Sequence, residues 1–337
     1  MITIRDVAVH AGVSVTTVSH VVNETRPVSA DLRQRVLAAM AELGYQPNAL
    51  ARSLRRKQTH TLGMIVPDSA NPFFAEVARG IEDTSFDIGY TVILCNSVGS
   101  LAREALYVDL LAKKQVDGVL LVAAGDSLRQ VRTLQARNIP LVVVDRDLPG
   151  SVVDCVLTDN VQGGRAATEH LLYLGHRRIG CITGASDLTP SAGRVDGYRQ
   201  ALDAAGIPGD ETLIVKGDFQ DQSGYAGAQE LLCLPNPPTA IFACNDLMAI
   251  GAMSAALEAG LRVPDDLSVV GFDDIHLAGY VNPPLTTVAQ PKFELGRVAA
   301  RMLLERIDQR ELAPRRRLLP TQLVVRHSTA ACAVMQH

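Results

Sequence analysis

Polar and aromatic side chains follow several apolar runs of the chain, at points where a ligand could be held. They are carboxylates, amides, guanidinium groups and phenyl rings, namely Asn71, Phe73, Phe74, Asp145, Arg146, Arg194, Phe219, Asn245, Asp273 and Gln290. The polar groups offer paired donors and acceptors to adjacent hydroxyls, and phenyl rings cover apolar C–H faces. Together they predict a site for a sugar-like ligand, although each segment alone also fits a turn, a core position or a helix cap.

The elements that would position these side chains are predicted by apolar runs that alternate with helical stretches after residue 60. Near-continuous apolar runs are typical of buried parallel strands, and they are TLGMIV, YTVILC, DGVLLV, PLVVV, RRIGCIT, TAIFAC and LSVVGF. The repeated βα units predict an α/β fold with doubly wound parallel sheets, in which ligands bind at the carboxyl ends of strands. Residues 59–337 are too many for one such lobe, so we expect two lobes with a cleft between them.

Several chemistries are disfavoured by motifs that the sequence lacks. It holds no GxGxxG, GxxxxGK[ST], HExxH or GxSxG pattern, and Gly163-Gly164 and the segment 224–227 fit helix starts and packing positions. The adjacent Asp273 and Asp274 are expected to point apart, so no catalytic pair and no enzyme activity are predicted. Six scattered cysteines show no ligand spacing, which argues against zinc and disulfides. We expect no cofactor, no metal and no phosphate group on the ligand.

The charge of the chain is divided between two parts. The net charge is −4 over 337 residues, but residues 1–60 carry eight Lys or Arg and four Asp or Glu. A basic head on an acidic body predicts that only the head meets a polyanion. No apolar run approaches about 18 residues, and the start MITIRDVAVHAG lacks the apolar core of a signal peptide. We therefore expect a cytoplasmic protein with no membrane contact.

Three short helices joined by tight turns are predicted in the first 46 residues. Thr3 can cap the first helix and Ser14 the second, with Gly12 in the turn between them. The second helix directs valines inward and leaves Val15, Thr16, Ser19 and His20 facing outward. A third helix is expected at about 29–43. A helix-turn-helix places its second helix in the major groove of DNA, although a plain three-helix cap would show the same spacing.

A short basic segment, residues 47–58, connects this head to the body. Asn48 can cap a helix, and Leu50 and Leu54 lie four residues apart in NALARSLRRKQT. About two helical turns are too few for stability in water, so we predict a hinge helix that folds on its target. Leu54 could then wedge between base pairs in the minor groove. A solvated linker with incidental positive charge is the alternative.

The head closely resembles that of the lactose/galactose repressor family. The resemblance rests on TIRDVAVHAGVSVTTVSHVVNETRPVS and ELGYQPNALARSL, and it continues in LGMIVPD, NPFF, KQVDGVLL, LGHRRIG, GYRQAL, PTAIFACNDLMAIGAM and GLRVPDDLSVVGFDD. Within the family the chain looks most similar to ribose operon repressors. The resemblance implies DNA contacts from Thr3, Ser14, Val15, Thr16, Thr17, His20, Asn23, Arg26, Tyr45, Asn48, Ala51, Leu54 and Arg55.

The resemblance also implies how the domains are arranged. It implies a helix-turn-helix domain at 1–46, a hinge helix or linker at 47–58, and a periplasmic-binding-protein-like core at 59–337. The N-terminal lobe would span about 59–160 plus 291–321, and the C-terminal lobe about 161–290 plus 322–330. Family members associate through the body, so a homodimer on a pseudo-palindromic double-stranded DNA operator is expected. The tail STAACAVMQH has no leucine heptads, which disfavours a tetramer.

The implied effector is D-ribose, acting as an inducer, because the polar set matches the pentose-holding positions of periplasmic ribose-binding proteins. Leu188 and Pro190 stand where purine repressors carry Arg and Thr, which disfavours a purine corepressor. Arg146 stands where the enteric ribose repressor carries Trp, so fructose or another sugar stays open. A transport-type sugar-binding protein would share the body but would need a signal peptide and no head. A nucleotide-dependent enzyme would need the phosphate loop that the sequence lacks.

Overall fold

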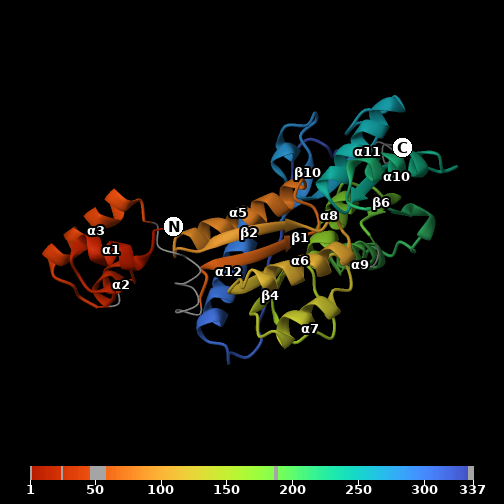
Figure 1. Ribbon diagram of the computed structural model, residues 1–337. Coiled ribbons are helices and arrows are strands. Elements are labelled where there is room, and N and C mark those ends of the chain that lie inside the picture. Colours follow the sequence, from red (N-terminus) through yellow and green to blue (C-terminus); the bar gives the residue numbers. More distant parts are fainter. Residues whose placement is uncertain (1, 24–25, 46–57, 186–188, 333–337) are drawn as a thin grey trace. The chain divides into compact units, whose positions relative to one another are not determined.

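The computed structural model describes residues 2–23, 26–45, 58–185 and 189–332 of the chain. The chain divides into two compact units, Met1–His60 and Thr61–His337 (Figure 1). The described part of the first unit forms helices, and the second unit is built from two mainly parallel sheets flanked by helices. Within the described ranges, every helix is too short or too polar to cross a lipid bilayer.

The first unit packs short helices around a small apolar core, which confirms the predicted helix-turn-helix arrangement. The helices are α1 (Ile4–Ala11), α2 (Val15–Asn23) and α3 (Ala30–Leu43). The Asp6 carboxylate accepts hydrogen bonds from the backbone N–H and the hydroxyl of Thr3, both at 2.8 Å, and so caps α1. Gly12 ends α1 at a φ of 63°, which glycine adopts without strain. The core side chains are Val7, Ala8, Ala11, Val18, Val21, Val36 and Ala39.

The first lobe of the second unit is a parallel sheet in the order β11-β5-β4-β3-β1-β2. Its strands are β1 (Thr61–Val66), β2 (Thr91–Asn96), β3 (Gly118–Leu121), β4 (Leu141–Val144), β5 (Asp154–Thr158) and β11 (Arg316–Leu319). One face packs on α5 (Pro72–Phe86) and α12 (Lys292–Asp308), the other on α6 (Leu101–Lys113) and α7 (Leu128–Ala136). Leu62 and Met64 of β1 face the first pair of helices and Ile65 faces the second, as strand alternation requires.

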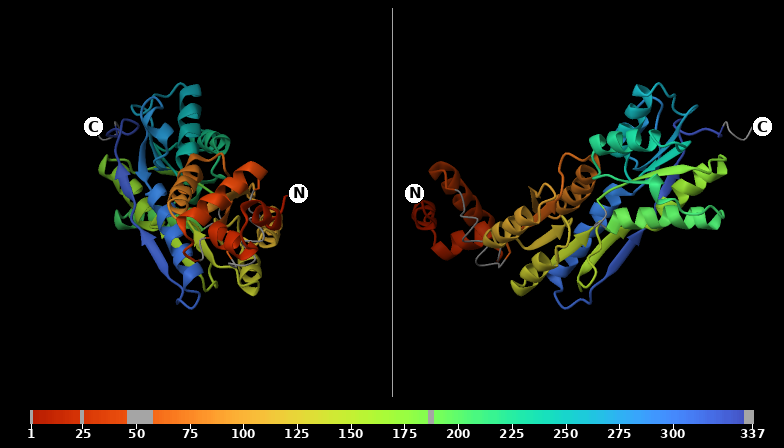
Figure 2. Two further views of the ribbon diagram at one scale, coloured as in Figure 1. Left: turned by 60° about the vertical axis from the view of Figure 1, so that its left-hand side comes forward. Right: turned by 90° about the vertical axis from the view of Figure 1, so that its right-hand side faces the viewer.

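The second lobe has the sheet order β12-β10-β9-β8-β6-β7, in which β12 alone of the described strands is antiparallel. Its strands are β6 (Ile179–Thr183), β7 (Ile214–Lys216), β8 (Ala240–Ala243), β9 (Ser268–Asp273), β10 (Thr286–Ala289) and β12 (Gln322–Val324). Helices α8 (Asn160–Tyr173) and α9 (Thr189–Ala204) pack together as one pair, and α10 (Asp221–Leu232) and α11 (Asp246–Glu258) as another. Figure 2 shows the two sheets from two further sides.

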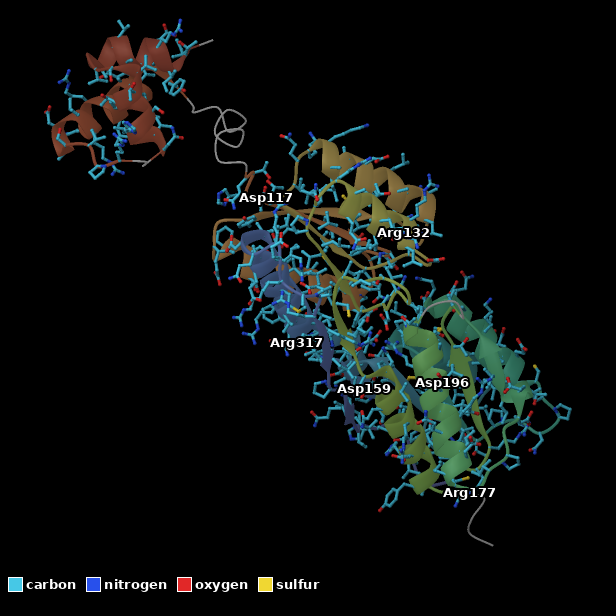
Figure 3. The ribbon with its side chains drawn as sticks, turned by 90° about the horizontal axis from the view of Figure 1, so that it is seen from below. Asp117, Arg132, Asp159, Arg177, Asp196 and Arg317 are labelled. Carbon is cyan, nitrogen blue, oxygen red and sulfur yellow. The ribbon has the colours of Figure 1, made fainter. Side chains whose placement is uncertain are left out.

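The chain passes between the lobes three times, between β5 and α8, between β10 and α12, and between β11 and β12. Asp159, labelled in Figure 3, lies at the first of these crossings. Its carboxylate accepts a hydrogen bond from the Gln162 N–H at 3.0 Å and so caps α8. Each lobe therefore takes its strands from separate parts of the sequence.

Glycines let the helix pair α8 and α9 approach closely. A Cβ at Gly164 would lie 2.2 Å from the Arg194 carbonyl oxygen, and one at Gly197 would lie 2.1 Å from that of Val161. Real side chains cannot occupy such positions, so both sites require glycine as long as the helices keep this spacing. The predicted packing role of Gly163-Gly164 is confirmed, and α9 is held where Arg194 reaches the carboxyl edge of the sheet.

Candidate functional site

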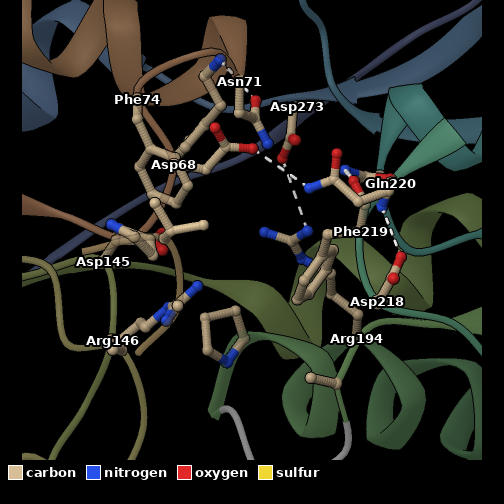
Figure 4. Close-up of a pocket in the computed structure, with 18 residues that line it drawn as sticks. Asp68, Asn71, Phe74, Asp145, Arg146, Arg194, Asp218, Phe219, Gln220 and Asp273 are labelled. Atoms are coloured by element: carbon tan, nitrogen blue, oxygen red, sulfur yellow. Dashed lines mark hydrogen bonds and ion pairs between the residues drawn. The ribbon is translucent and has the colours of Figure 1, made fainter. Parts of the chain in front are cut away.

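A cavity of about 570 Å³ lies between the two lobes, at the carboxyl ends of their strands (Figure 4). Every predicted effector position except Gln290 lines it. The lining residues are Pro67, Asp68, Asn71, Phe73, Phe74, Val98, Gly99, Ala124, Asp145, Arg146, Ala185, Pro190, Arg194, Asp218, Phe219, Gln220, Asn245 and Asp273. Residues far apart in the sequence meet here because the carboxyl ends of parallel strands share one edge of each sheet.

The turn after β1 brings the Asn71-Pro72-Phe73-Phe74 segment to the cavity. The Asn71 side-chain oxygen accepts a hydrogen bond from the Phe73 N–H at 2.9 Å, and Pro72 occupies the first position of α5. This fixes the two phenyl rings at the start of the helix, where they pack edge to face with centres 5.1 Å apart. The rings supply apolar surface, while the Asn71 oxygen is already engaged in capping the helix.

Asp145 and Arg146 follow β4 and are both buried. The Asp145 N–H donates to the Val156 carbonyl at 2.8 Å, and the residue has a φ of 66° where it lines the cavity. Oδ1 of Asp145 has no hydrogen-bond partner in the part of the chain that the structure describes. Burial raises the pKa of Asp145, although the positive charges of Arg194 and Arg146 lower it. A ligand that donates a hydrogen bond would satisfy this oxygen.

Arg194 projects from α9 beneath the cavity. Its Nε donates to Asn160 Oδ1 at 2.8 Å, and one Nη1–H donates to the Cys244 carbonyl at 2.5 Å. Nη1 also lies 3.5 Å from Asp273 Oδ1, as an ion pair. Burial raises the pKa of Asp273 to about 6, and the Arg194 charge and a hydrogen bond from Gln290 counteract that rise.

Gln290 lies behind Asp273 rather than in the cavity wall. Its Nε2 donates to Asp273 Oδ1 at 2.6 Å, and its Oε1 accepts a hydrogen bond from the Thr158 hydroxyl. Thr158 belongs to β5 of the first lobe, so Gln290 joins the two lobes while it holds the carboxylate. The structure therefore places Gln290, which was predicted to contact the ligand, where it supports the Asp273 carboxylate instead.

Asn245 and Phe219 face the cavity from the second lobe. The Asn245 oxygen accepts a hydrogen bond from the Met248 N–H at 2.9 Å, and its Nδ2 donates to the Phe219 carbonyl at 2.9 Å. Phe219 has a φ of 71°, and the guanidinium carbon of Arg194 lies 5.8 Å from the centre of its ring. One amide thus fixes the start of α11 and the turn that carries the phenyl ring.

Three polar lining residues were not predicted: Asp68, Asp218 and Gln220. The Gln220 Nε2 donates to Asp68 Oδ2 at 3.2 Å, which joins the two lobes across the cavity (Figure 4). Each follows a strand by two to four residues, so the rule that found the other positions could have found them. The cavity wall therefore holds four carboxylates and two guanidinium groups, those of Asp68, Asp145, Asp218 and Asp273 and those of Arg146 and Arg194. No cluster of metal-ligating side chains occurs among the described residues.

The predicted DNA-contacting positions that the structure describes divide into three groups. Val15 and Thr16 are exposed on α2, with His20 half-buried one turn further along. Capping positions include Thr3 and Ser14, whose hydroxyl oxygen accepts from the Thr17 N–H at 3.0 Å. The remaining described positions are Asn23, which donates to the Ser19 carbonyl at 2.8 Å, exposed Arg26, and half-buried Tyr45. Asn48, Ala51, Leu54 and Arg55 lie outside the described residues, as does Leu188.

Known proteins match almost the whole chain. Residues 3–48 match the family model for bacterial regulatory proteins of the lacI family, and residues 168–329 match that of a periplasmic binding protein-like domain. The HTH-type transcriptional repressor PurR of Photobacterium profundum is 43% identical over 97% of this chain and 98% of its own.

Solved structures agree in fold over most or nearly all of the chain. The lac repressor dimer bound to operator and the anti-inducer ONPF is 32% identical, with a TM-score of 0.88 over 98% of this chain and 99% of that one. A LacI family regulator from Enterococcus faecium with bound ribose is 35% identical, with a TM-score of 0.74 over 81% and 99%. Identity above 30% across nearly the full length, with a shared fold, establishes common ancestry: the chain belongs to the lacI family of bacterial regulatory proteins.

Proposed function

We propose that this protein is a transcriptional repressor that binds a DNA operator, and that a monosaccharide in the cleft, D-ribose in the first place, lowers its operator affinity. The observation that carries the proposal is the combination of two parts in one chain. One is a helix-turn-helix unit with an exposed uncharged face on α2, and the other is a cavity lined by carboxylates, guanidinium groups and phenyl rings. A transport-type binding protein would not need the first part.

The cavity favours an uncharged ligand with many hydroxyls. Four carboxylates outnumber two guanidinium groups in its wall, which disfavours a phosphorylated or acidic ligand. The buried Oδ1 of Asp145 calls for a donor, and a sugar hydroxyl can donate to it and accept from a neighbouring guanidinium. Phe74 and Phe219 supply flat apolar surfaces for the C–H faces of a sugar ring.

The identity of the effector has one serious competitor. Repressors named PurR are 43% identical to this chain, whereas the Enterococcus faecium structure with bound ribose is 35% identical. Overall identity reflects the whole scaffold, while effector choice depends on the few side chains in the cavity. Pro190 lines the cavity here and offers neither a donor nor a side-chain acceptor to a purine edge. Purines are therefore the second candidate, and fructose or another furanose-forming sugar is the alternative among sugars.

A homodimer is proposed from two exposed apolar faces of the second unit. On the first lobe, Leu94 of the edge strand β2 and Leu106 of α6 are 49% and 69% exposed. On the second lobe, Leu257 of α11 and Tyr280 are 77% and 74% exposed. Exposed apolar side chains on neighbouring elements of both lobes fit a self-complementary interface. Two copies would offer two recognition helices to the two halves of a pseudo-palindromic operator in the bacterial cytoplasm.

In this mechanism the sugar acts through a difference in affinity between two arrangements of the lobes. The cavity wall comes from both lobes, so a bound sugar favours the arrangement that closes around it. From the sequence we predict that the lobe movement acts on operator affinity through the connecting segments at 47–58, which apart from residue 58 lie outside the described residues. Coupling of about 1–3 kcal/mol would change operator affinity roughly 5- to 150-fold.

Two measurements on the full-length protein test the proposal. Isothermal titration against D-ribose, D-fructose, other pentoses and hexoses, hypoxanthine and guanine identifies the effector class. Gel shifts with the operator, selected from a random DNA pool, then test whether that ligand releases the protein. Binding of a purine with no sugar binding would overturn the sugar assignment. Sugar binding without selection of any DNA sequence would favour a transport-type protein.

A further inference from the structure

A carboxylate is fully buried in the first lobe, behind the cavity wall. Glu104 lies in the first turn of α6, and its exposed fraction is 0%. Burial raises the pKa of Glu104, while the nearby Ser127 hydroxyl, the hydrogen bond from the Ala124 N–H and the charge of Arg146 lower it. A buried carboxylate is costly unless its partners are specific, so its contacts show what it does.

The Glu104 carboxylate and the Arg146 guanidinium hold the same peptide group. Glu104 Oε2 accepts a hydrogen bond from the Ala124 N–H at 2.7 Å. Arg146 Nη1 donates to the Ala123 carbonyl oxygen. This carbonyl and this N–H belong to one peptide bond, and in a trans peptide they point in opposite directions. The anion and the cation are therefore joined through a single peptide.

The Glu104 carboxylate, the Ala123–Ala124 peptide and the Arg146 guanidinium follow one another in an electrostatically favourable order. The positive end of the peptide dipole, its N–H, faces the Glu104 carboxylate, and the negative end faces the Arg146 guanidinium. Consecutive hydrogen bonds polarise one another, and those to charged groups are the stronger kind. The negative charge of Glu104 therefore strengthens the hydrogen bond that holds Arg146.

This chain of contacts ends at the cavity. Ala124 and Arg146 both line it, and the guanidinium carbon of Arg146 lies 6.0 Å from the centre of the Phe74 ring. Gln130 of α7 braces the other end, because its Nε2 donates to the Leu101 carbonyl in the first turn of α6 at 3.2 Å. Glu104 thus lies in a turn of α6 that α7 holds in place, and one peptide links it to a side chain in the cavity wall.

We propose that Glu104 is a positioning residue for the effector site, which holds the Arg146 guanidinium through the Ala123–Ala124 peptide in the orientation that binds sugar hydroxyls. The proposal rests on the proposed function, since it takes Arg146 as a sugar contact. Glu104 itself touches no ligand. Without the Glu104 charge, the hydrogen bond from Arg146 Nη1 to the Ala123 carbonyl is weaker, so the guanidinium is less firmly oriented before a sugar binds.

The test uses the full-length protein with Glu104→Gln, Glu104→Ala, Arg146→Ala and the double variant Glu104→Ala/Arg146→Ala. Asp109→Asn is the matched control, because Asp109 is an exposed carboxylate of α6 that pairs with Arg137 at 2.7 Å. Titration with D-ribose should show about tenfold weaker binding for Glu104→Ala. Glu104→Gln should lose less, because its amide oxygen still accepts from Ala124. The control should bind like the wild type.

Coupling between the two residues is the decisive result. If Glu104 acts through Arg146, the double variant binds no more weakly than Arg146→Ala alone. Losses that add, or wild-type binding by Glu104→Gln, would overturn the proposal. Should Glu104→Ala fail to fold, Glu104→Gln and its double variant with Arg146→Ala decide the same question.

A second readout does not depend on any ligand. In arginine side-chain NMR spectra of the free protein, Arg146→Ala identifies the Arg146 Nε–Hε signal. Glu104→Gln should shift or broaden that signal, and an unchanged signal contradicts the positioning role. A wild-type protein that binds no sugar would refute the proposed function alone, since this spectrum still decides the inference.

Discussion

Arg194 and Asp273 form a buried ion pair at the cavity, with Arg194 Nη1 3.5 Å from Asp273 Oδ1. The guanidinium carbon lies 3.9 Å from the centre of the Phe272 ring, so an apolar face covers the cation on one side. Burial raises the pKa of Asp273 to about 6 even with Arg194 beside it. A ligand in the cavity would therefore meet one fixed donor and one acceptor whose charge changes near pH 6.

Replacing Arg194 by alanine should abolish the response to sugar while operator binding is retained. The change removes hydrogen-bond donors from the cavity and leaves the helix-turn-helix unit intact. We expect sugar affinity to fall at least about tenfold, measured by titration, and gel shifts to show no release at wild-type sugar concentrations. Arg199→Ala, on the exposed face of the same helix, is the control. Sugar-dependent release of Arg194→Ala would mean that the cavity is not the effector site.

Sugar affinity should rise with pH through about 6. The folded-state pKa of Asp273 lies above its ordinary value of 3.8. Only the ionised carboxylate accepts freely from sugar hydroxyls, so below pH 6 binding must first release a proton. The groups that face this carboxylate are Arg194, Gln290, Asp145 and Lys292. Titration between pH 5 and pH 8 measures the slope, and Asp273→Asn should flatten it.

The pH response has a second contributor with the same sign. Burial also raises the pKa of Asp145, so its deprotonation likewise favours binding as pH rises. A steep slope that survives in Asp273→Asn and disappears in Asp145→Asn would assign the response to Asp145 instead. A pH-independent affinity in the wild type would show that neither carboxylate accepts hydrogen bonds from the ligand.

Replacing His20 by alanine should relax base preference more than it weakens non-specific DNA binding. His20 is half-buried on α2, one turn beyond the exposed Thr16, and its ring nitrogens can hydrogen-bond to base edges. We expect a cost of about 1–3 kcal/mol on the preferred operator and little change on random DNA. Competition gel shifts measure both. An equal loss on all sequences would indicate a phosphate contact.

Gly197→Ala should destabilise the second lobe. Its new Cβ would lie 2.1 Å from the Val161 carbonyl oxygen, so α8 and α9 must separate. We expect the free energy of unfolding to fall by about 1–3 kcal/mol, measured by urea denaturation. Asp203→Ala, at the exposed end of α9, should change it little. Unchanged stability of Gly197→Ala would show that the helices can readily move apart.

The sequence alone determined much of the architecture, because local patterns report burial. The apolar runs predicted β1, β2, β3, β4, β6, β8 and β9, and Thr3 with Asp6 predicted the start of α1. It did not reveal β5, β11 or the short β12. The first begins with Asp154, whose buried carboxylate accepts from Arg306 at 2.7 Å, and the second, RRLL, is an exposed edge. A strand with paired charges or open faces leaves no apolar run.

The residues of the cavity likewise divide into those that the sequence predicted and those that only the tertiary structure placed. The rule that ligands meet the carboxyl ends of strands predicted nine of the lining residues from the sequence, since it depends only on where each strand ends, but Asp68, Asp218 and Gln220 were missed. Only the tertiary structure placed Gln290 behind Asp273 and formed the hydrogen bond from Gln220 to Asp68 across the cleft. It also brought Glu104 and Arg146 to hydrogen-bond to the two ends of one peptide group. These contacts join residues from 17 to 152 positions apart. They follow from how the lobes and helices pack, which no local pattern in the chain encodes.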